Sequence, residues 1–462
     1  MPSIHWRCAA QALIAVALYG VSVETGRAQS GSPFRYDDDL TPYIAAAQKG
    51  SGFDRWKYIP LSDDPRIYLS FGADLRERVE ASNDTLLGYR NRGSNVYDLH
   101  RLLVYSDLHH DDFRAFVQIG SHTETGRSPA ALPTDMDRGD LQQAFLDYSP
   151  RMAGDQWVFR GGRFEMSFDE GALVSLRDGP NVRQVWDGLR TSVTLRTIHV
   201  DAFVVASVGV SPGYFDDSVL HGQTLWGIHF QTTPAFQGPV AISGFYYDST
   251  MPKVLLSPTP GREHTHTAGV LLRREDSDFD ASIGGIVQTG RFNSWDVLAW
   301  SNHGELGWTF SALPGSPRVG LRADALSGGP STSGTVHTFN ALYPNYAFST
   351  QATIEAPSNL IQCGGNLDLH PARSLTLQYK IEGLWRYSVH DAFYAAPTFA
   401  LVMPSGANER YSGLAQQVQS TWNINQFVSV LAAYVHFAPG AFLQSKGAVN
   451  ENFGMAQVTL RF

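Results

Sequence analysis

Residues 157–196 read WVFRGGRFEMSFDEGALVSLRDGPNVRQVWDGLRTSVTLR. The stretch opens as a strand over 157–164, where two adjacent glycines predict that another backbone approaches closely. It closes as a second strand over 187–196, in which polar and apolar residues alternate. Between the two strands the alternation stops, and arginines stand among the turn residues Asp, Gly, Pro and Asn. We predict that this irregular segment, near 165–186, folds inward and narrows a pore.

Strand-like segments separated by Gly, Pro, Asp and Asn follow one another from residue 67 to residue 462. We place candidate strands at 67–80, 97–110, 113–123, 140–149, 156–164, 187–197, 198–208, 222–233, 238–249, 262–275, 278–292, 295–312, 317–327, 335–348, 359–370, 373–388, 411–423, 426–437 and 452–462. One or two of these are expected to be loops or merged strands.

Alternation within these segments separates charged from apolar side chains, and Asp74, Arg76, Arg78 and Glu80 share one strand face. One wet face and one apolar face suit a soluble sandwich as well as a barrel with an aqueous interior. Two features favour the barrel: opposite charges lie side by side on the polar faces, and aromatic residues recur near strand ends, where interfacial girdles belong. These aromatic residues are Tyr68, Tyr97, Tyr148, Trp157, Trp186, Trp226, Tyr246, Trp295, Trp385 and Trp422.

Length supports the same interpretation. Residues 67–462, spread over eighteen strands, leave about 22 residues for each strand and its connection, whereas a tilted strand needs about 9–11 to cross a bilayer. Closure of the sheet also removes the exposed strand edges. The sequence therefore predicts an all-β fold, a single antiparallel transmembrane β-barrel of about 18 strands over residues 66–462.

The N-terminal region has a different composition. Residues 1–28 show the pattern of a secretory signal peptide: Arg7, an apolar run at 9–21 and a small-x-small cleavage site at 26–28. Residues 29–65 are polar and irregular, and we expect them to form a periplasmic N-terminal segment. Removal of the signal peptide leaves Cys363 alone, so the fold must be stable without an internal disulfide.

Charge and motifs restrict the function. The net charge of −9 argues against nucleic acid as a partner. The segment 209–213 fits the G-x-S-x-G pattern, but Pro212 lacks the N–H that an oxyanion hole requires, so we interpret the segment as a turn. His264 and His266 share a strand face, but no third metal ligand is apparent in the sequence. We expect no catalytic residues, no metal site and no cofactor.

Several blocks resemble the alginate-export family of Gram-negative outer-membrane barrels. They are 57–61, 71–80, 142–147, 162–166, 177–183 and 187–190, with weaker matches at 339–344 and 437–443. The resemblance implies a barrel with a charged constriction, a conduit for polysaccharide or sugar acids, and no catalysis. One departure is Gln184, which stands where a second basic residue is expected after Arg183.

Arginine matches a carboxylate with two parallel hydrogen bonds, and a polyuronate carries one carboxylate on each sugar. In a wet lumen each ion pair is worth about 0–1 kcal/mol, so a solute can enter and leave. We therefore expect pore-lining or substrate-binding roles for Arg76, Arg78, Glu80, Arg114, Asp147, Arg160, Arg163, Arg177, Arg183, Asp187, Arg190, Arg322 and Lys380. The alternative for any single arginine is a structural role, since buried charges are normally paired.

These observations predict an outer-membrane channel for passive export or diffusion of anionic, alginate-like polysaccharide or sugar acids. Its expected partners are that solute, outer-membrane lipid and, as a further candidate, a periplasmic export protein. The first alternative is a general or substrate-specific nutrient-uptake porin of the same fold. The second is a soluble polysaccharide-degrading enzyme on a β fold, which would need a catalytic set in a groove.

Overall fold

The structure, a computed structural model, describes residues 33–38, 40, 43, 55–233, 236, 238–256, 260–329, 334–395, 399–404 and 408–462. The expected signal peptide at 1–28 lies outside the described residues. No helix in these ranges is long and apolar enough to span a membrane.

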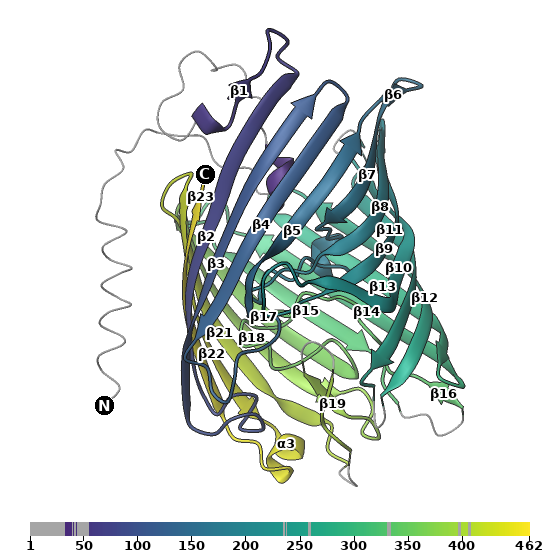
Figure 1. The fold of residues 1–462 in the computed structure, drawn as a ribbon. Helices are drawn as coiled ribbons and strands as arrows, with labels where there is room; N and C mark the ends of the chain where they lie inside the picture. The colour runs from purple at the N-terminus through teal and green to yellow at the C-terminus, as the bar shows by residue number, and fades with distance from the viewer. Residues whose placement is uncertain are drawn as a thin grey trace.

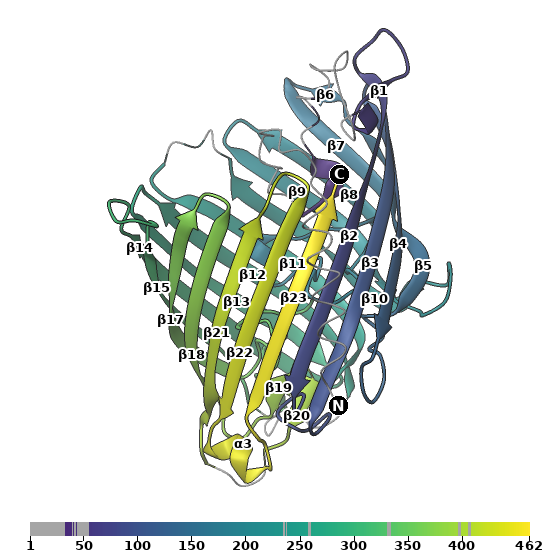
Figure 2. The ribbon, with the colours of Figure 1, turned by 90° about the vertical axis from the view of Figure 1, so that its left-hand side faces the viewer.

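Within the described ranges, antiparallel strands form one sheet that closes into a barrel of 18 strands (Figures 1 and 2). They are β2 (Ile67–Asn83), β3 (Ser94–His110), β4 (Phe113–Thr125), β5 (Asp137–Tyr148), β7 (Asp155–Phe164), β8 (Trp186–Leu195), β9 (Ile198–Gly209), β10 (Ser218–Thr232), β11 (Ala241–Val254), β12 (Gly261–Glu275), β13 (Phe279–Phe292), β14 (Trp295–Thr309), β15 (Arg318–Leu326), β17 (Leu360–Ala372), β18 (Leu375–Arg386), β21 (Tyr411–Asn423), β22 (Val428–Pro439) and β23 (Glu451–Arg461). The first and last of them, β2 and β23, pair with each other and close the sheet. The predicted all-β single barrel is confirmed.

The remaining elements are short. Three of them attach to barrel strands: β1 (Ile59–Pro60) to β2, β6 (Arg151–Met152) to β7, and β16 (Thr335–Val336), in parallel, to β14. β19 (Phe393–Ala395) and β20 (Phe399–Val402) form a separate hairpin. The helical turns in the described ranges are η1 (Arg35–Asp37), η3 (Asp169–Gly171) and α3 (Ala441–Ser445).

The two ends of the barrel differ in their connections. At the end we call the turn end, most connections are short, such as 111–112 and 373–374, and β23 ends there (Figure 1). At the opposite end, which we call the loop end, most are longer, and 165–185, 327–359 and 387–410 are the longest. Short turns at one end and long loops at the other are typical of transmembrane barrels.

The two faces of the wall differ in polarity. In β2, the inward-facing Asp74, Arg76, Arg78 and Glu80 are buried, which agrees with the face predicted from alternation. The outer face carries exposed apolar side chains on strands all around the barrel, including Val104, Leu146, Leu189, Val204, Ile283, Leu306, Leu321 and Val418. This apolar outer surface suits contact with lipid.

Some of the expected girdle aromatics face inward instead. Tyr68, Tyr97 and Trp186 are buried, and the Trp186 ring packs edge-on against Tyr343 at 5.8 Å. Tyr148, Trp226, Trp295 and Trp422 are exposed. Trp186 packs into the apolar core inside the barrel, Tyr68 packs in a smaller cluster with Leu40 and Tyr58, and the Tyr97 hydroxyl donates to Glu80.

The candidate strand at 335–348 is wrong. Only Thr335 and Val336 pair with the wall, and the chain then runs into the barrel interior. Phe339, Leu342 and Tyr343 are buried there, so the apolar pattern that suggested a strand arises from packing inside the barrel. Residues 337–359 are therefore a second inward segment, and we call the whole connection between β15 and β17 the β15–β17 loop.

Candidate functional site

The β7–β8 loop (165–185) turns inward where β7 ends. Phe164 and Trp186, the wall residues on either side of it, are fully buried and pair across the ladder. An added Cβ at Gly162 would lie 2.2 Å from the backbone oxygen of Ala144, so β5 and β7 need glycine here to approach each other. The predicted close backbone approach and the predicted inward fold are both confirmed.

The tip of the β7–β8 loop is fastened to β2. Arg76 donates hydrogen bonds to the backbone oxygens of Asp178 (2.7 Å) and Pro180 (3.0 Å). Arg78 donates to the backbone oxygen of Gly179 at 2.7 Å. Both guanidinium groups are buried and occupied by loop carbonyls. These two predicted pore-lining arginines therefore anchor the loop.

The Asp178 carboxylate joins two further arginines. Its Oδ1 accepts hydrogen bonds from Arg101 Nη2 and from Arg183 Nε, each at 2.7 Å. Arg101 lies directly opposite Arg76 in the β2–β3 ladder, where like charges repel. Although burial opposes ionisation, Arg101 and Arg183 hold the pKa of Asp178 well below its usual range. Asp178 thus supplies a negative charge to a cluster of arginines that come from β2, β3 and the β7–β8 loop.

Two more carboxylates complete this network. Glu165 Oε2 lies 3.5 Å from Arg183 Nη1. Glu80 lies 3.2 Å from Arg78 Nη1 and accepts a hydrogen bond from the Tyr97 hydroxyl. The structure therefore brings together Arg76, Arg78, Glu80 and Arg183 from the predicted set.

Sequence reasoning missed Arg101 and Asp178. Arg101 shares its strand face with Leu99 and Leu103, which are buried, so this stretch of β3 does not read as a charged face. Asp178 has the sequence context of an ordinary turn residue. The available signal was the alternation itself, which places Arg101 beside the β2 arginines once the strands pair.

The two inward loops meet in the lumen. Ser175 N donates to Tyr343 O at 3.0 Å, and Tyr343 N donates to Leu173 O at 2.9 Å, which makes a parallel bridge between Val174 and Tyr343. Leu173, Val174 and Tyr343 are buried. The loops therefore narrow the lumen as one packed unit.

Arg177 stands apart from the other arginines of the loop. Its guanidinium lies over the rings of Tyr346 (4.8 Å) and Tyr343 (5.3 Å), and its hydrogen bonds go to Gln184 Oε1 and Leu342 O, both at 3.3 Å. No ion pair among the described residues includes Arg177. Its backbone has a φ of 53°, a strained conformation for arginine. The charge of Arg177 is thus held by neutral groups between the two loops.

The arginines of β4, β7 and β8 each pair with a carboxylate of the wall. Arg114 binds Asp107 with two hydrogen bonds of 2.8 and 2.6 Å, and Arg160 binds Asp147 with two of 2.8 and 2.9 Å. Arg190 lies 2.7 Å from Asp201 and above the Phe168 ring at 5.6 Å. These pairs face inward, but Arg114 and Arg160 line neither of the two lumenal cavities described below.

Residues 33–38, part of the expected periplasmic segment 29–65, pack against this inner wall. Tyr36 is buried with Arg160 above its ring at 4.2 Å, and its hydroxyl donates to Glu165 O at 2.8 Å. Arg114 donates to Tyr36 O at 2.7 Å. Arg35 donates to Phe462 O at 2.7 Å, beside the junction of β2 and β23. The segment therefore links the barrel wall to the β7–β8 loop.

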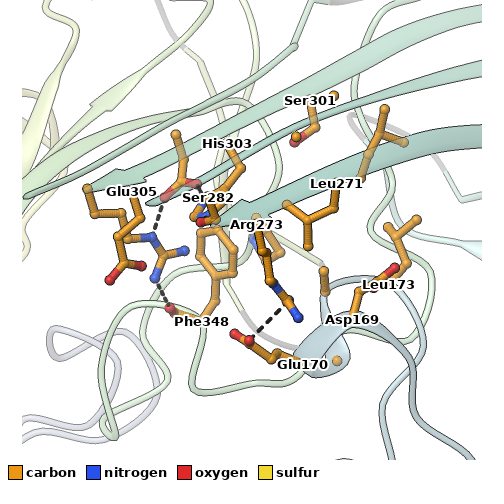
Figure 3. Close-up of a pocket in the computed structure, with 18 of the residues that line it drawn as sticks. Asp169, Glu170, Leu173, Leu271, Arg273, Ser282, Ser301, His303, Glu305 and Phe348 are labelled. Carbon is orange, nitrogen blue, oxygen red and sulfur yellow. Dashed lines mark hydrogen bonds and ion pairs between the residues drawn. The ribbon is translucent and has the colours of Figure 1, made fainter. Parts of the chain in front are cut away.

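A cavity of about 450 Å³ lies in the turn-end half of the lumen, and we call it the lumen cavity. Figure 3 shows side chains that line it. Its wall comes from β11 to β15, from β18 and from both inward loops, including Leu173 and Phe348. Arg273, on β12, reaches across to Glu170 of η3 at 3.0 Å (Figure 3). The cavity is mixed in character, with charged side chains set among apolar ones.

Four arginine or lysine side chains line the lumen cavity, Arg273, Arg274, Arg322 and Lys380. Three of them, Arg273, Arg322 and Lys380, lie on the inner strand face. Arg322 lies 2.6 Å from Asp324, and Lys380 lies 3.5 Å from Glu382. Each of the three is partly exposed and paired with one acid, in contrast to the buried arginines around Asp178. Arg322 and Lys380 belong to the predicted set. Arg273 was missed because it begins a run of charged residues, 273–276, that looks like a turn at the end of the strand.

A second cavity, of about 360 Å³, lies toward the loop end. Its lining includes Arg78, Gly179, Pro180 and Tyr346. Asn345 and Ala347 line the lumen cavity, whereas Tyr346 between them lines this one, so the β15–β17 loop separates the two. Arg177 and its two tyrosines lie where the two inward loops meet.

Arg163 and Asp187 do not join the inward groups. They pair through two hydrogen bonds of 2.8 and 3.1 Å, on the face of β7 and β8 opposite to Phe164 and Trp186. The structure thus places them on the outer face of the wall. Strand alternation already predicts this face, because Arg163 lies three residues from the inward Arg160 and Asp187 lies three residues from the inward Arg190.

The structure also places the G-x-S-x-G segment and the histidine pair, which the sequence analysis did not interpret as functional sites. Ser211 lies in the β9–β10 connection as a turn residue. His264 and His266 lie on β12, and the neighbouring strand β11 brings Asp248 to both of them, at 3.1 and 2.9 Å. A third ligand-type side chain is therefore present, and only strand pairing reveals it.

Comparison with known proteins supports the architecture. Three solved structures from Pseudomonas aeruginosa are similar. OccK8 (OprE) has 9% identity over 87% of this chain and 99% of its own, with a TM-score of 0.56. OccD3 (OpdP) has 11% identity over 88% and 94%, with a TM-score of 0.57. OccK2 (OpdF), solved in complex with glucuronate, has 8% identity over 85% and 98%, with a TM-score of 0.55. At these identities the likeness shows the fold. No curated protein matches the chain.

A family model settles the relationship that the fold leaves open. The model described as alginate export matches residues 67–457, which covers the barrel from its first strand into its last. The apolar outer surface, the closed sheet and the polar inner wall are the features that a bilayer requires of such a protein. The chain belongs to the alginate-export family and is a β-barrel of the outer membrane.

Proposed function

We propose that this barrel lets sugar acids and their anionic polymers diffuse across the outer membrane through the lumen cavity and past a constriction formed by Arg177, Tyr343 and Tyr346. The observation that carries the proposal is the difference between two sets of basic residues. The arginines around Asp178 are buried and occupied, whereas Arg273, Arg322 and Lys380 are partly exposed in a cavity. The second set therefore offers partly exposed positive charge to a carboxylate in the cavity, and Arg177 adds a charge with no ion-pair partner among the described residues.

The charges of the lumen cavity suit transit. Each basic group there already has an acidic partner, so a solute carboxylate competes with an existing ion pair. Such exchange in a wet cavity is worth about 0–1 kcal/mol for each contact, which lets the solute leave again. A cavity of about 450 Å³ has the size of a small-molecule site, which suits one or two sugar units at a time.

Orientation follows from the connections. Short turns of outer-membrane barrels face the periplasm and long loops face outward. The lumen cavity then opens on the periplasmic side of the two loops, where an exported polymer would enter. A structural neighbour was solved with glucuronate, a sugar acid, which favours this class of solute. The same geometry serves inward diffusion, so a nutrient-uptake porin is the alternative.

The test compares two triple variants in planar bilayers. Arg177→Gln with Arg322→Gln and Lys380→Gln removes three lumenal charges, and Arg66→Gln with Arg151→Gln and Arg373→Gln removes three exposed charges outside the lumen. We expect the lumenal variant alone to lose anion selectivity and to weaken glucuronate block by about tenfold, since each contact is worth up to about fivefold. Equal behaviour of the two variants would refute the proposed solute path.

Liposome swelling separates the alternatives. Faster entry of glucuronate and oligouronates than of neutral sugars of equal size supports the sugar-acid conduit. Equal rates for charged and neutral sugars identify a general porin, and entry of monomers without oligomers identifies an uptake channel.

A further inference from the structure

We propose that Asp248, His264 and His266 form a binding site for a divalent zinc-type metal ion on the outer face of the barrel. Asp248 lies on β11 directly opposite His266 on β12. Its Oδ2 is 3.1 Å from His264 Nε2 and 2.9 Å from His266 Nδ1. The three side chains come from two neighbouring strands and converge on one point.

Alternation places the site outside the barrel. Tyr247, Ser249, Thr265 and Thr267 are buried on the inner side, so the residues between and beside them project outward. Both imidazoles are roughly half exposed, with Asp248 buried beneath them. His264 and His266 lie in the half of β12 nearer the loop end, and Asp248 lies near the middle of β11.

The donor set is that of a zinc site. Two imidazole nitrogens and one carboxylate are the three protein ligands of a common open zinc geometry, with a fourth position left for an outside ligand. Tetrahedral bonds of about 2.0–2.1 Å place neighbouring ligand atoms about 3.3 Å apart. The three ligand atoms all lie within 4.8 Å of one another, so small side-chain movements suffice.

The surroundings define what else touches the site. The Tyr246 hydroxyl lies 2.9 Å from His266 Nδ1 and must yield that nitrogen to a metal. Arg291 lies opposite His264 across the β12–β13 ladder, and its charge is partly offset by Asp296 at 3.9 Å. The open position faces away from the wall, on the same outer face as Trp226 and Tyr246, whose ring centroids lie 5.7 Å apart.

Two imidazoles and a carboxylate are unusual on a lipid-facing surface, because polar side chains there are costly unless they are paired or functional. Mutual pairing accounts for part of this arrangement. The same three groups, with their ligand atoms already gathered at one point, also have the composition of a metal site.

The experiment uses the purified full-length barrel in detergent, treated with EDTA and then titrated with Zn²⁺, and separately with Co²⁺, whose visible absorption reports tetrahedral coordination. We expect one ion for each barrel. His264→Ala with His266→Ala should weaken binding at least tenfold, and Asp248→Asn should weaken it as well. His221→Ala with His390→Ala removes two exposed histidines elsewhere and should leave the affinity unchanged.

Electrophoretic mobility of unheated samples shows that each variant is a closed barrel, so loss of binding is not confused with loss of fold. Absence of stoichiometric binding in the unaltered barrel overturns the site. Retention of full affinity in the His264, His266 variant also overturns it, since the ion then binds elsewhere. Both results are independent of whether sugar acids pass through the lumen.

Discussion

Replacement of Asp178 by Asn should release the β7–β8 loop from the wall. The change removes the charge that Arg101 and Arg183 share, while it keeps the size of the side chain. Removing one partner of a fully buried ion pair costs about 3–5 kcal/mol, and an exposed pair is worth about 0–1 kcal/mol. The Asp178 side chain is 46% exposed, whereas Arg101 and Arg183 are buried. We therefore expect an intermediate cost of about 2–3 kcal/mol.

That cost shifts the balance between docked and released loop by about 30- to 150-fold, because 1.4 kcal/mol corresponds to a factor of ten. A released loop widens the lumen, so single-channel records of Asp178→Asn should spend that much more time at a high-conductance level. Asp276→Asn, which breaks an exposed ion pair with Arg274 at the turn end, is the matched control and should behave like the unaltered barrel. A change of less than threefold for Asp178→Asn would show that the carboxylate does not hold the loop.

Three further predictions test the wall, the loop core and the outer surface. Gly162→Ala should destabilise the barrel, because its Cβ would lie 2.2 Å from a backbone oxygen. Gly161→Ala meets only the tip of the Leu189 side chain and should be tolerated. Urea unfolding of the two variants checks this. Burial raises the pKa of Glu355 from 4.5 to about 7. Packing of the β15–β17 loop is therefore strongest below about pH 4.5, where Glu355 is neutral in both states, and weakens by about 3 kcal/mol as the pH rises through 7. The fraction of time spent at the high-conductance level should rise over that pH range in the unaltered barrel and stay flat in Glu355→Gln. Val204→Arg should cost about 2–4 kcal/mol if Val204 faces the bilayer core, whereas Phe215→Arg in the β9–β10 connection should cost under about 1 kcal/mol; comparable costs would contradict the assigned lipid face.

The wall was predictable from sequence because two-residue alternation has a direct physical cause, water on one face and lipid on the other. The face holding Asp74, Arg76, Arg78 and Glu80 followed from this alone. The same reasoning failed at 335–348, where both sides of the chain are packed and periodicity carries no information about the wall.

The candidate site was less predictable, because it depends on contacts between strands far apart in the chain. Arg76 and Arg78 were found as charged and inward, but their occupation by the carbonyls of 178–180 depends on how a loop folds. Arg163 and Asp187 have the same residue types as the inward pairs and differ only in strand face. Asp248 joins His264 and His266 only through the register of β11 and β12.

The hydrogen bond from Arg35 to Phe462 O has a consequence for the order of folding. It joins residues 427 positions apart, beside the pairing of Asp74 with Arg461. Contacts of such sequence separation pay the largest loop-closure entropy, so they form late. Until they form, β2 and β23 are unpaired edges open to aggregation. Protection of Arg35 from solvent should therefore appear last during refolding and report that the sheet has closed.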